Sequence, residues 1–149
     1  MPRDNLLKGR ISLAHHAYHV TLCAHNRLPL FRDFTDARLV VTEMRKLHED
    51  GILNSLAWVI MPDHLHWLFQ LGEQMTLSES MKRLKARSAH AINQCHGQHG
   101  TVWQKGYYDH ALRDEEDIQS AARYIVANPL RAGLVEKIGD YSLWDAIWL

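Results

Sequence analysis

The sequence predicts an α+β fold, because segments with the alternating pattern of strands are interspersed with segments that have the apolar spacing of helices. Two strand patterns, at 53–61 and 64–71, are separated only by Pro62-Asp63, which predicts an antiparallel hairpin. A capping-box sequence, Thr76-Leu77-Ser78-Glu79, opens a long helical pattern soon after it. For the whole chain, the predicted order of elements is β-α-β-β-α-β-α.

One strand and one helix are predicted before this hairpin. Residues 18–24 are rich in β-branched and aromatic side chains with partial alternation, and Asn26-Arg27-Leu28-Pro29 breaks the pattern. Thr35 or Asp36 is the expected N-cap of the helix that follows, and Gly51 is its expected stop.

One more strand and one more helix are predicted after the long helix, which we expect to end near Cys95. Residues 103–112 resemble a strand, with Gly106 at a bulge. Asp114 is the expected cap of a third helix, and we expect Pro129 to end it, because proline disfavours helical geometry in the residue before it. The residues beyond 139 have weak periodicity and predict no further element.

This order is that of the ferredoxin-like, split β-α-β fold, with a four-stranded antiparallel sheet and one additional C-terminal helix. Its two crossovers place two helices on one face of the sheet and leave the other face to the third helix or a substrate. The chain has 149 residues without repeats or a Pro/Gly-rich linker, so a single domain over 1–149 is predicted. Residues 1–14 are expected to form a flexible basic arm.

Composition narrows the functional classes. The formal net charge is zero, so contacts with nucleic acid must come from local basic patches. Cys23 and Cys95 form no CxxC pair, which argues against a zinc knuckle or a redox pair, and two free thiols fit a reducing compartment. No apolar run approaches the ~20 residues that span a bilayer, and the N-terminus lacks a signal peptide's apolar stretch. We therefore expect a cytoplasmic protein without a membrane partner.

His64 and His66 lie one residue apart in the third predicted strand. Side chains at i and i+2 of a strand point to the same face, so the two imidazoles are suited to bind one divalent metal. Tyr124 and Asn128 lie four residues apart on the third predicted helix and share a face. A histidine pair within reach of a helical tyrosine is suited to cutting a phosphodiester through a protein–DNA covalent link.

Each of these residues also has a purely structural interpretation. His-x-His pairs are often incidental, and eleven histidines make chance pairs expected. Helical tyrosines usually pack at the edge of a core, and Asn128 can be a helix C-cap. The distinguishing feature of the His64–His66 pair is the alternation that places Leu65 and Trp67 on the opposite face.

Three segments, in this order along the chain, resemble the REP-associated tyrosine transposases. The segments are Trp58-Val59-Ile60-Met61-Pro62-Asp63-His64-Leu65-His66, Val102-Trp103-Gln104-Lys105-Gly106-Tyr107-Tyr108-Asp109-His110 and Ala122-Arg123-Tyr124-Ile125-Val126-Ala127-Asn128-Pro129-Leu130-Arg131-Ala132-Gly133-Leu134-Val135. That family consists of domesticated relatives of the single-tyrosine insertion-sequence transposases, within the HUH (His-hydrophobe-His) nuclease superfamily. The resemblance runs from about Tyr18 to Trp144.

The resemblance implies a metal-dependent endonuclease and strand transferase that acts on single-stranded DNA at REP-type hairpins through a 5′-phosphotyrosine intermediate. It implies His64 and His66 as ligands of Mg²⁺ or Mn²⁺, Tyr124 as the nucleophile, and Asn128 as a third ligand, where relatives often have Gln. Relatives act as monomers or homodimers. We expect phosphate contacts from Arg83, Arg87, Lys105 and Arg113, and from Arg3, Lys8 and Arg10 of the arm.

Three other functions remain open from the sequence. One is a domesticated module that grips hairpin nucleic acid without cutting it. Another is a metalloenzyme with a non-DNA substrate, built on the histidine pair, in which Tyr124 has no role. The third, an RNA-binding domain of the same fold, is disfavoured because the strands lack the paired aromatic residues that such modules use.

Overall fold

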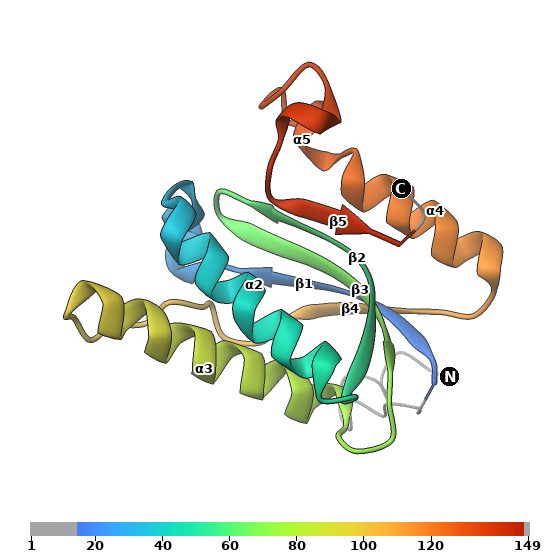
Figure 1. Ribbon diagram of the computed structural model, residues 1–149, viewed down its shortest axis with the longest axis horizontal. Coiled ribbons are helices and arrows are strands. Elements are labelled where there is room, and N and C mark those ends of the chain that lie inside the picture. Colours follow the sequence, from blue (N-terminus) through green and yellow to red (C-terminus); the bar gives the residue numbers. More distant parts are fainter. Residues whose placement is uncertain (1–14, 148–149) are drawn as a thin grey trace.

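The computed structural model describes residues 15–147, which form an α+β molecule around one five-stranded antiparallel sheet (Figure 1). The strands are β1 (Ala17–Cys23), β2 (Leu53–Met61), β3 (His64–Leu71), β4 (Tyr108–Leu112) and β5 (Trp144–Ala146), in the spatial order β4-β1-β3-β2-β5. The helices are α2 (Phe34–Glu49), α3 (Leu77–His96), α4 (Glu115–Val126) and α5 (Asn128–Arg131). Short 3-10 turns are η1 (His25–Arg27), η2 (Leu30–Arg32) and η3 (Ile138–Asp140). The predicted basic arm with Arg3, Lys8 and Arg10 lies outside the described residues.

The predicted α+β, split β-α-β arrangement is confirmed, with one more strand than expected. The hairpin of β2 and β3 has the predicted bounds, and α3 begins with the predicted capping box on Thr76. The fifth strand, β5, pairs antiparallel with β2 at the edge of the sheet. Three residues are too few to produce a recognisable alternation, which is why the sequence predicts only four strands.

Other element boundaries also differ from the predictions. The N-cap of α2 is Asp33, rather than Thr35 or Asp36, because the Asp33 carboxylate accepts hydrogen bonds from both of their backbone N–H groups. Strand β4 begins only at Tyr108, and Trp103 makes an isolated bridge to Ala24.

The alternation of the strands divides the core between the two faces of the sheet. Helices α2 and α3 cover one face, and α4 covers part of the other (Figure 1). The face under α2 and α3 has the larger cluster, which includes Val20, Leu22, Leu65, Trp67 and Phe69. The smaller cluster places Val59, Met61 and Leu68 against Ala122, Ile125 and Val126 of α4. Within residues 15–147, no helix combines the length and apolarity needed to cross a membrane.

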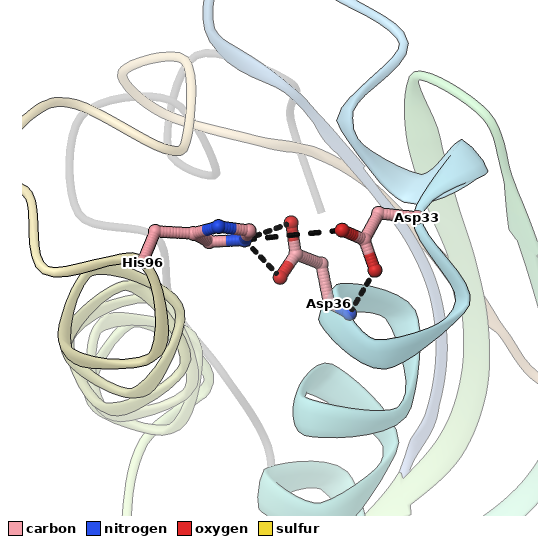
Figure 2. A group of neighbouring side chains, drawn as sticks. All are labelled: Asp33, Asp36 and His96. Atoms are coloured by element: carbon pink, nitrogen blue, oxygen red, sulfur yellow. Dashed lines mark hydrogen bonds and ion pairs between the residues drawn. The ribbon is translucent and has the colours of Figure 1, made fainter.

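A polar clamp joins the start of α2 to the end of α3 (Figure 2). His96 Nε2 lies 2.8 and 3.0 Å from the two carboxylate oxygens of the buried Asp36, and 3.9 Å from Asp33 Oδ2. The ligand atoms of the three residues lie within 4.8 Å of one another, which is close enough for a cation. Because Asp33 already caps α2 and Asp36 already pairs with His96, the cluster is accounted for as an interhelical contact.

Candidate active site

His64 and His66 lie on the face of β3 that α4 covers. His64 pairs with Met61 across the hairpin, and His66 pairs with Val59. Directly paired residues of an antiparallel ladder share a face, and Met61 and Val59 belong to the cluster that packs against α4. The two imidazole centres are 4.8 Å apart. The same-face arrangement therefore follows the alternation of the sequence.

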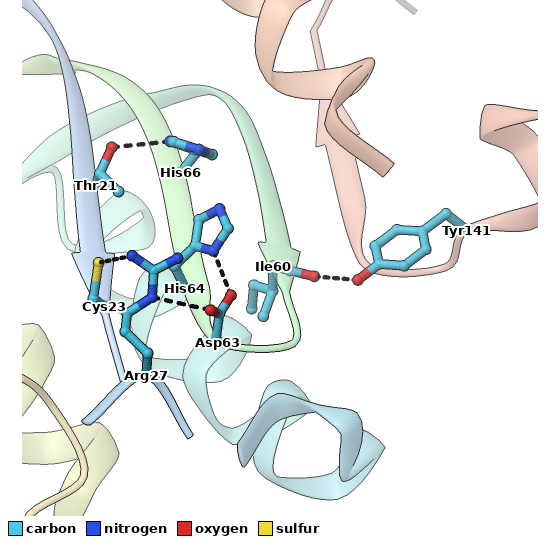
Figure 3. A network of polar contacts seen from close by, with 8 residues as sticks. All are labelled: Thr21, Cys23, Arg27, Ile60, Asp63, His64, His66 and Tyr141. Carbon is cyan, nitrogen blue, oxygen red and sulfur yellow. Dashed lines mark hydrogen bonds and ion pairs between the residues drawn. The ribbon is translucent and has the colours of Figure 1, made fainter. Parts of the chain in front are cut away.

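Asp63, in the turn before β3, orients His64 (Figure 3). Its Oδ1 atom lies 2.7 Å from Nδ1 of His64, and its Oδ2 atom accepts a hydrogen bond from Nε of Arg27 at 2.9 Å. Burial alone would raise the pKa of Asp63, but the hydrogen bonds from His64 and Arg27 outweigh it and lower that pKa. An ionised carboxylate can only accept a hydrogen bond, so His64 donates to Asp63 through Nδ1, and Nε2 is the ring nitrogen that remains for a ligand.

Strand β1 orients His66 in a similar way. Nδ1 of His66 lies 2.9 Å from Thr21 Oγ1 and 3.1 Å from His19 Nε2. Burial, followed by the nearby charges of His19 and His64, lowers the pKa of His66 to about 3. Burial, followed by the charge of His110, lowers the pKa of His19 to about 4. The imidazoles of His66 and His19 are therefore neutral at pH 7. A histidine must be neutral to bind a metal, and His66 meets this condition.

This donor set fits a divalent metal. In both histidines Nδ1 is engaged, and in the described part of the chain no hydrogen bond involves either Nε2 atom. A metal-ligating histidine characteristically gives its other ring nitrogen to a carboxylate or another polar partner, as here. Imidazole with oxygen ligands suits Mn²⁺, and Mg²⁺ when oxygen ligands dominate.

Tyr124 stands beside the histidines, on the side of α4 that does not pack into the core. Ala122 and Ile125 of the same helix are buried against the sheet, whereas Tyr124 is 53 % exposed. The centre of its ring lies 6.3 Å from that of His66 and 6.4 Å from that of His19. The phenol therefore borders the imidazole pair and is accessible to a large substrate.

Arg131 completes this side of the site. Helix α4 ends at Val126, with Ala127 as its C-cap, and the chain continues into the short helix α5 around Pro129. This arrangement places the Arg131 guanidinium carbon 3.9 Å from the centre of the Tyr124 ring. Pro129 therefore lies within a new helical turn, whereas the sequence predicted that it would end the helix.

The structure places the other predicted site residues in four locations. Asn128, at the start of α5, is half-buried one helical turn beyond Tyr124. Lys105 precedes β4 and lines a cavity next to Thr21. Arg113 is exposed between β4 and α4. Arg83 and Arg87 line a hollow between α2 and α3, on the opposite face of the sheet from the histidine pair.

Sequence reasoning assigned no role to Arg27, Asp63, His19, Thr21 or Arg131. His19 and Thr21 do carry a signal, because they are two residues apart on β1, as the His pair is on β3. For Arg27 the signal is conformational, since its φ of 54° lies in the left-handed region, where a non-glycine residue is uncommon. Such backbone outliers gather at functional sites.

Residues 12–128 match the family described as transposase IS200 like. The chain belongs to this family. The REP-associated tyrosine transposase of Escherichia coli strain K12 is 28% identical over 97 residues, which are 64% of this chain and 56% of the relative. The chain thus spans about half the length of the curated relatives it matches.

A solved structure supports the same assignment of the fold for this IS200-like transposase. It is the structure of a REP-associated tyrosine transposase bound to a REP hairpin, and it superposes with a TM-score of 0.77 at 23% identity. The match covers 91% of this chain and 79% of that one. The two chains therefore share a fold.

Proposed function

We propose that this IS200-like transposase is a metal-dependent, single-stranded DNA endonuclease and strand transferase that acts on REP-type hairpins. The observation that carries the proposal is the convergence of three side chains from distant segments. The imidazoles of His64 and His66, the second of which is neutral at pH 7, lie beside an exposed phenol whose ring centre is 6.3 Å from that of His66. This is the arrangement that a tyrosine nucleophile and a metal-bound phosphate require.

In the proposed reaction, Tyr124 Oη attacks the phosphorus of one phosphodiester. The phenol loses its proton to solvent, a bond forms between Oη and phosphorus, and the bond from phosphorus to the 3′ oxygen breaks. The 3′ oxygen takes up a proton and leaves as a free hydroxyl, while the 5′ phosphate stays on Tyr124. Because the phosphodiester energy is retained in the phosphotyrosine, attack by a 3′ hydroxyl reverses the step and transfers a strand.

His64 and His66, with Asn128 as a third ligand, would hold Mg²⁺ or Mn²⁺. A bound metal would act as a Lewis acid on the scissile phosphate. The chain itself supplies the orientation: Asp63 and Thr21 aim the two imidazoles through their Nδ1 atoms. Arg131 is placed to bind a non-bridging phosphate oxygen, because its planar guanidinium offers several N–H donors next to Tyr124.

The proposed partner is a DNA hairpin with a single-stranded flank, bound by a monomer or a homodimer. The proposed substrate is unpaired at the scissile phosphate, because a single strand leaves that phosphate accessible to the histidine pair and to Tyr124. Lys105 and Arg113 flank β4 next to the site and are proposed phosphate contacts. Arg83 and Arg87 would contact a part of the DNA that passes the opposite face.

Covalent capture tests this proposal. Hairpin oligonucleotides with single-stranded flanks are first selected for binding to the Tyr124→Phe protein, and are then incubated with the unmodified chain and Mg²⁺ or Mn²⁺. We expect a protein–DNA adduct that survives a denaturing gel. Tyr124→Phe should bind the selected hairpin but form no adduct. Tyr141→Phe is the matched control, because it removes a hydroxyl that bonds Ile60 O outside the site, and it should form the adduct.

Three results would contradict the proposal or one of its parts. If the unmodified chain binds the hairpins without forming an adduct with either metal, the protein is a binding module. If Tyr124→Phe still forms an adduct, another side chain is the nucleophile. Adduct formation that persists in His64→Ala with a chelator present would show that the histidine pair is not a metal site.

A further inference from the structure

A second hollow opens next to the histidine pair, on the side away from Tyr141. It has a volume of about 190 Å³ and is lined by Thr21 and Cys23 of β1 and by residues 104–108. Pockets for drug-sized ligands measure about 300–1,000 Å³, so this one suits a single planar ring. Residues 104–108 belong to one of the three segments that carry the family resemblance, yet only Lys105 has a proposed role so far.

The register of the sheet joins this cavity to the candidate active site. Thr21 pairs with His66 on one side and with Tyr108 on the other, while Cys23 pairs with His64. Directly paired residues share a face, so the cavity and the histidines lie on the same face. Tyr108 is two strands away from His66, about 10 Å at the usual strand spacing. Neighbouring nucleotides of an unstacked strand span such a distance.

Helix α3 holds the wall of the cavity in place. The ammonium of Lys85 donates to the carbonyl oxygens of Gln104, at 2.9 Å, and of Gly106. The hydroxyl of Tyr107 lies 3.0 Å from Ser78 Oγ. Burial lowers the pKa of Lys85, and its contacts with the loop show that this lysine shapes the protein and is not directed at a ligand. The loop is therefore ordered before any ligand arrives.

The side chains that remain free to meet a ligand match the parts of a nucleotide. The ring of Tyr108 is 65% exposed, which is unusual for a large aromatic residue in a strand. Gln104 is exposed and offers both donor and acceptor atoms, whereas the hydroxyl of Thr21 is already engaged with His66. Lys105 adds a positive charge for the sugar–phosphate backbone. Aromatic stacking beside a basic residue is the usual way to hold an unpaired base.

We propose that this cavity holds one unpaired base of the DNA strand, next to the phosphate at His64 and His66, with the base stacked on Tyr108. The position of that phosphate rests on the proposed function, whereas the chemistry of the cavity does not. The segment 104–108 is then the part of the chain that recognises a base, while the histidine pair and Tyr124 act on the backbone.

Two probes with equal charge isolate the contribution of the bases. They are the single-stranded octamer of thymidylate and an octamer of abasic sites with the same backbone. Both are titrated against Tyr124→Phe protein in a buffer with chelator, so that neither cleavage nor metal contributes. The measured quantity is the dissociation constant of the abasic octamer divided by that of the thymidylate octamer. This ratio is compared between the Tyr124→Phe protein and proteins that also carry Tyr108→Ala, Tyr108→Phe or Phe34→Ala.

We expect Tyr108→Ala to reduce this ratio about tenfold, because stacking of one base on an aromatic ring is worth roughly 1–3 kcal/mol. Tyr108→Phe retains the ring and should keep the ratio. Phe34→Ala, which removes a comparably exposed ring at the start of α2, should also keep it. Lys105→Ala should weaken both octamers equally, since it removes only a charge.

Three results would contradict the base-pocket proposal. They are an unchanged ratio in Tyr108→Ala, an equally reduced ratio in Phe34→Ala, and no binding of either octamer. The result is separable from the nuclease proposal. If the chain forms no covalent adduct but its base-dependent affinity falls in Tyr108→Ala, the base-pocket proposal is supported and the nuclease proposal is contradicted. If the chain forms the adduct but the ratio is unchanged in Tyr108→Ala, the nuclease proposal is supported and the base-pocket proposal is contradicted.

Discussion

The Arg131 guanidinium stacks on the ring of Tyr124, with 3.9 Å between the guanidinium carbon and the ring centre, and donates a hydrogen bond of 2.7 Å to the Tyr124 carbonyl oxygen. The contact covers one face of the ring, and it places a guanidinium next to the proposed nucleophile. It depends on the break between α4 and α5, because a straight helix would carry Arg131 two turns beyond Tyr124.

Replacement of Arg131 should slow adduct formation more than it weakens hairpin binding. In Arg131→Gln we expect the single-turnover rate of adduct formation to fall about 100-fold, because a donor aimed at developing charge contributes most in the transition state. Arg131→Lys, which keeps the charge without the planar fork, should recover part of the rate. Arg123→Gln, an exposed arginine of α4 that contacts only Ser120 among the described residues, is the control and should react normally. Equal losses in rate and affinity would make Arg131 a simple binding residue.

Removal of the groups that aim the histidines should weaken metal binding. For Asp63→Asn and for Thr21→Val we expect the Mn²⁺ dissociation constant, measured by calorimetry without DNA, to rise about 10- to 100-fold. The reason is that Nδ1 of His64 loses its charged partner, or Nδ1 of His66 loses the nearer of its two partners, while the ligating nitrogen stays in place. Asp140→Asn changes an exposed carboxylate outside the site and should leave the affinity unchanged. Unaltered affinity in both test variants would mean that the metal binds elsewhere.

Acid should destabilise the metal-free protein through His19 and His66. Their pKa values in the folded protein are about 4 and about 3, below the value of about 6.5 of an unfolded histidine. Below pH 6.5 the unfolded chain therefore binds protons at these two histidines that the folded chain does not bind. Their contribution to the free energy of unfolding is fully present above pH 6.5 and is lost as the pH falls toward 4 and 3. We expect about 1 kcal/mol of unfolding free energy lost per pH unit for each histidine, below the limit set by one proton.

Urea unfolding at a series of pH values, with chelator present, measures this loss. His19→Gln should reduce the slope between pH 6.5 and 4 to about half, because His66 still contributes. His90→Gln, which changes an exposed histidine of α3, should leave it unaltered. A dependence that is equally steep in all three proteins would assign the acid sensitivity to other groups.

The clamp between α2 and α3 should contribute to stability without affecting the site. We expect Asp36→Asn to lower the free energy of unfolding by about 1 kcal/mol, because a partly buried hydrogen bond between the Asp36 carboxylate and His96 is weakened. The double variant with His96→Ala should lose little more, since both changes break one contact. Adduct formation should stay normal, because the clamp lies on the other face of the sheet. A Mn²⁺-dependent stabilisation that disappears in Asp36→Asn would instead make the cluster a metal site.

The hairpin and the long helix could be predicted because their signals are local. Pro62-Asp63 marks the turn between two alternating segments, and Thr76 with Glu79 forms a capping box that needs no distant partner. The end of α4 and strand β5 lacked such signals. Pro129 can begin a helix as well as end one, and a three-residue edge strand exists only because β2 offers an unpaired edge.

The amino-acid order alone places His64 and His66 on one face and gives Tyr124 an exposed side of its helix, since each follows from the period of a single element. Only the tertiary structure brings in Thr21, Arg27 and Arg131. Thr21 meets His66 across 45 residues of chain and Arg27 meets Asp63 across 36, by strand pairing and a turn that no local pattern encodes. The periodicity of a strand or helix determines which face a side chain is on, whereas tertiary packing determines which residues from other segments it contacts.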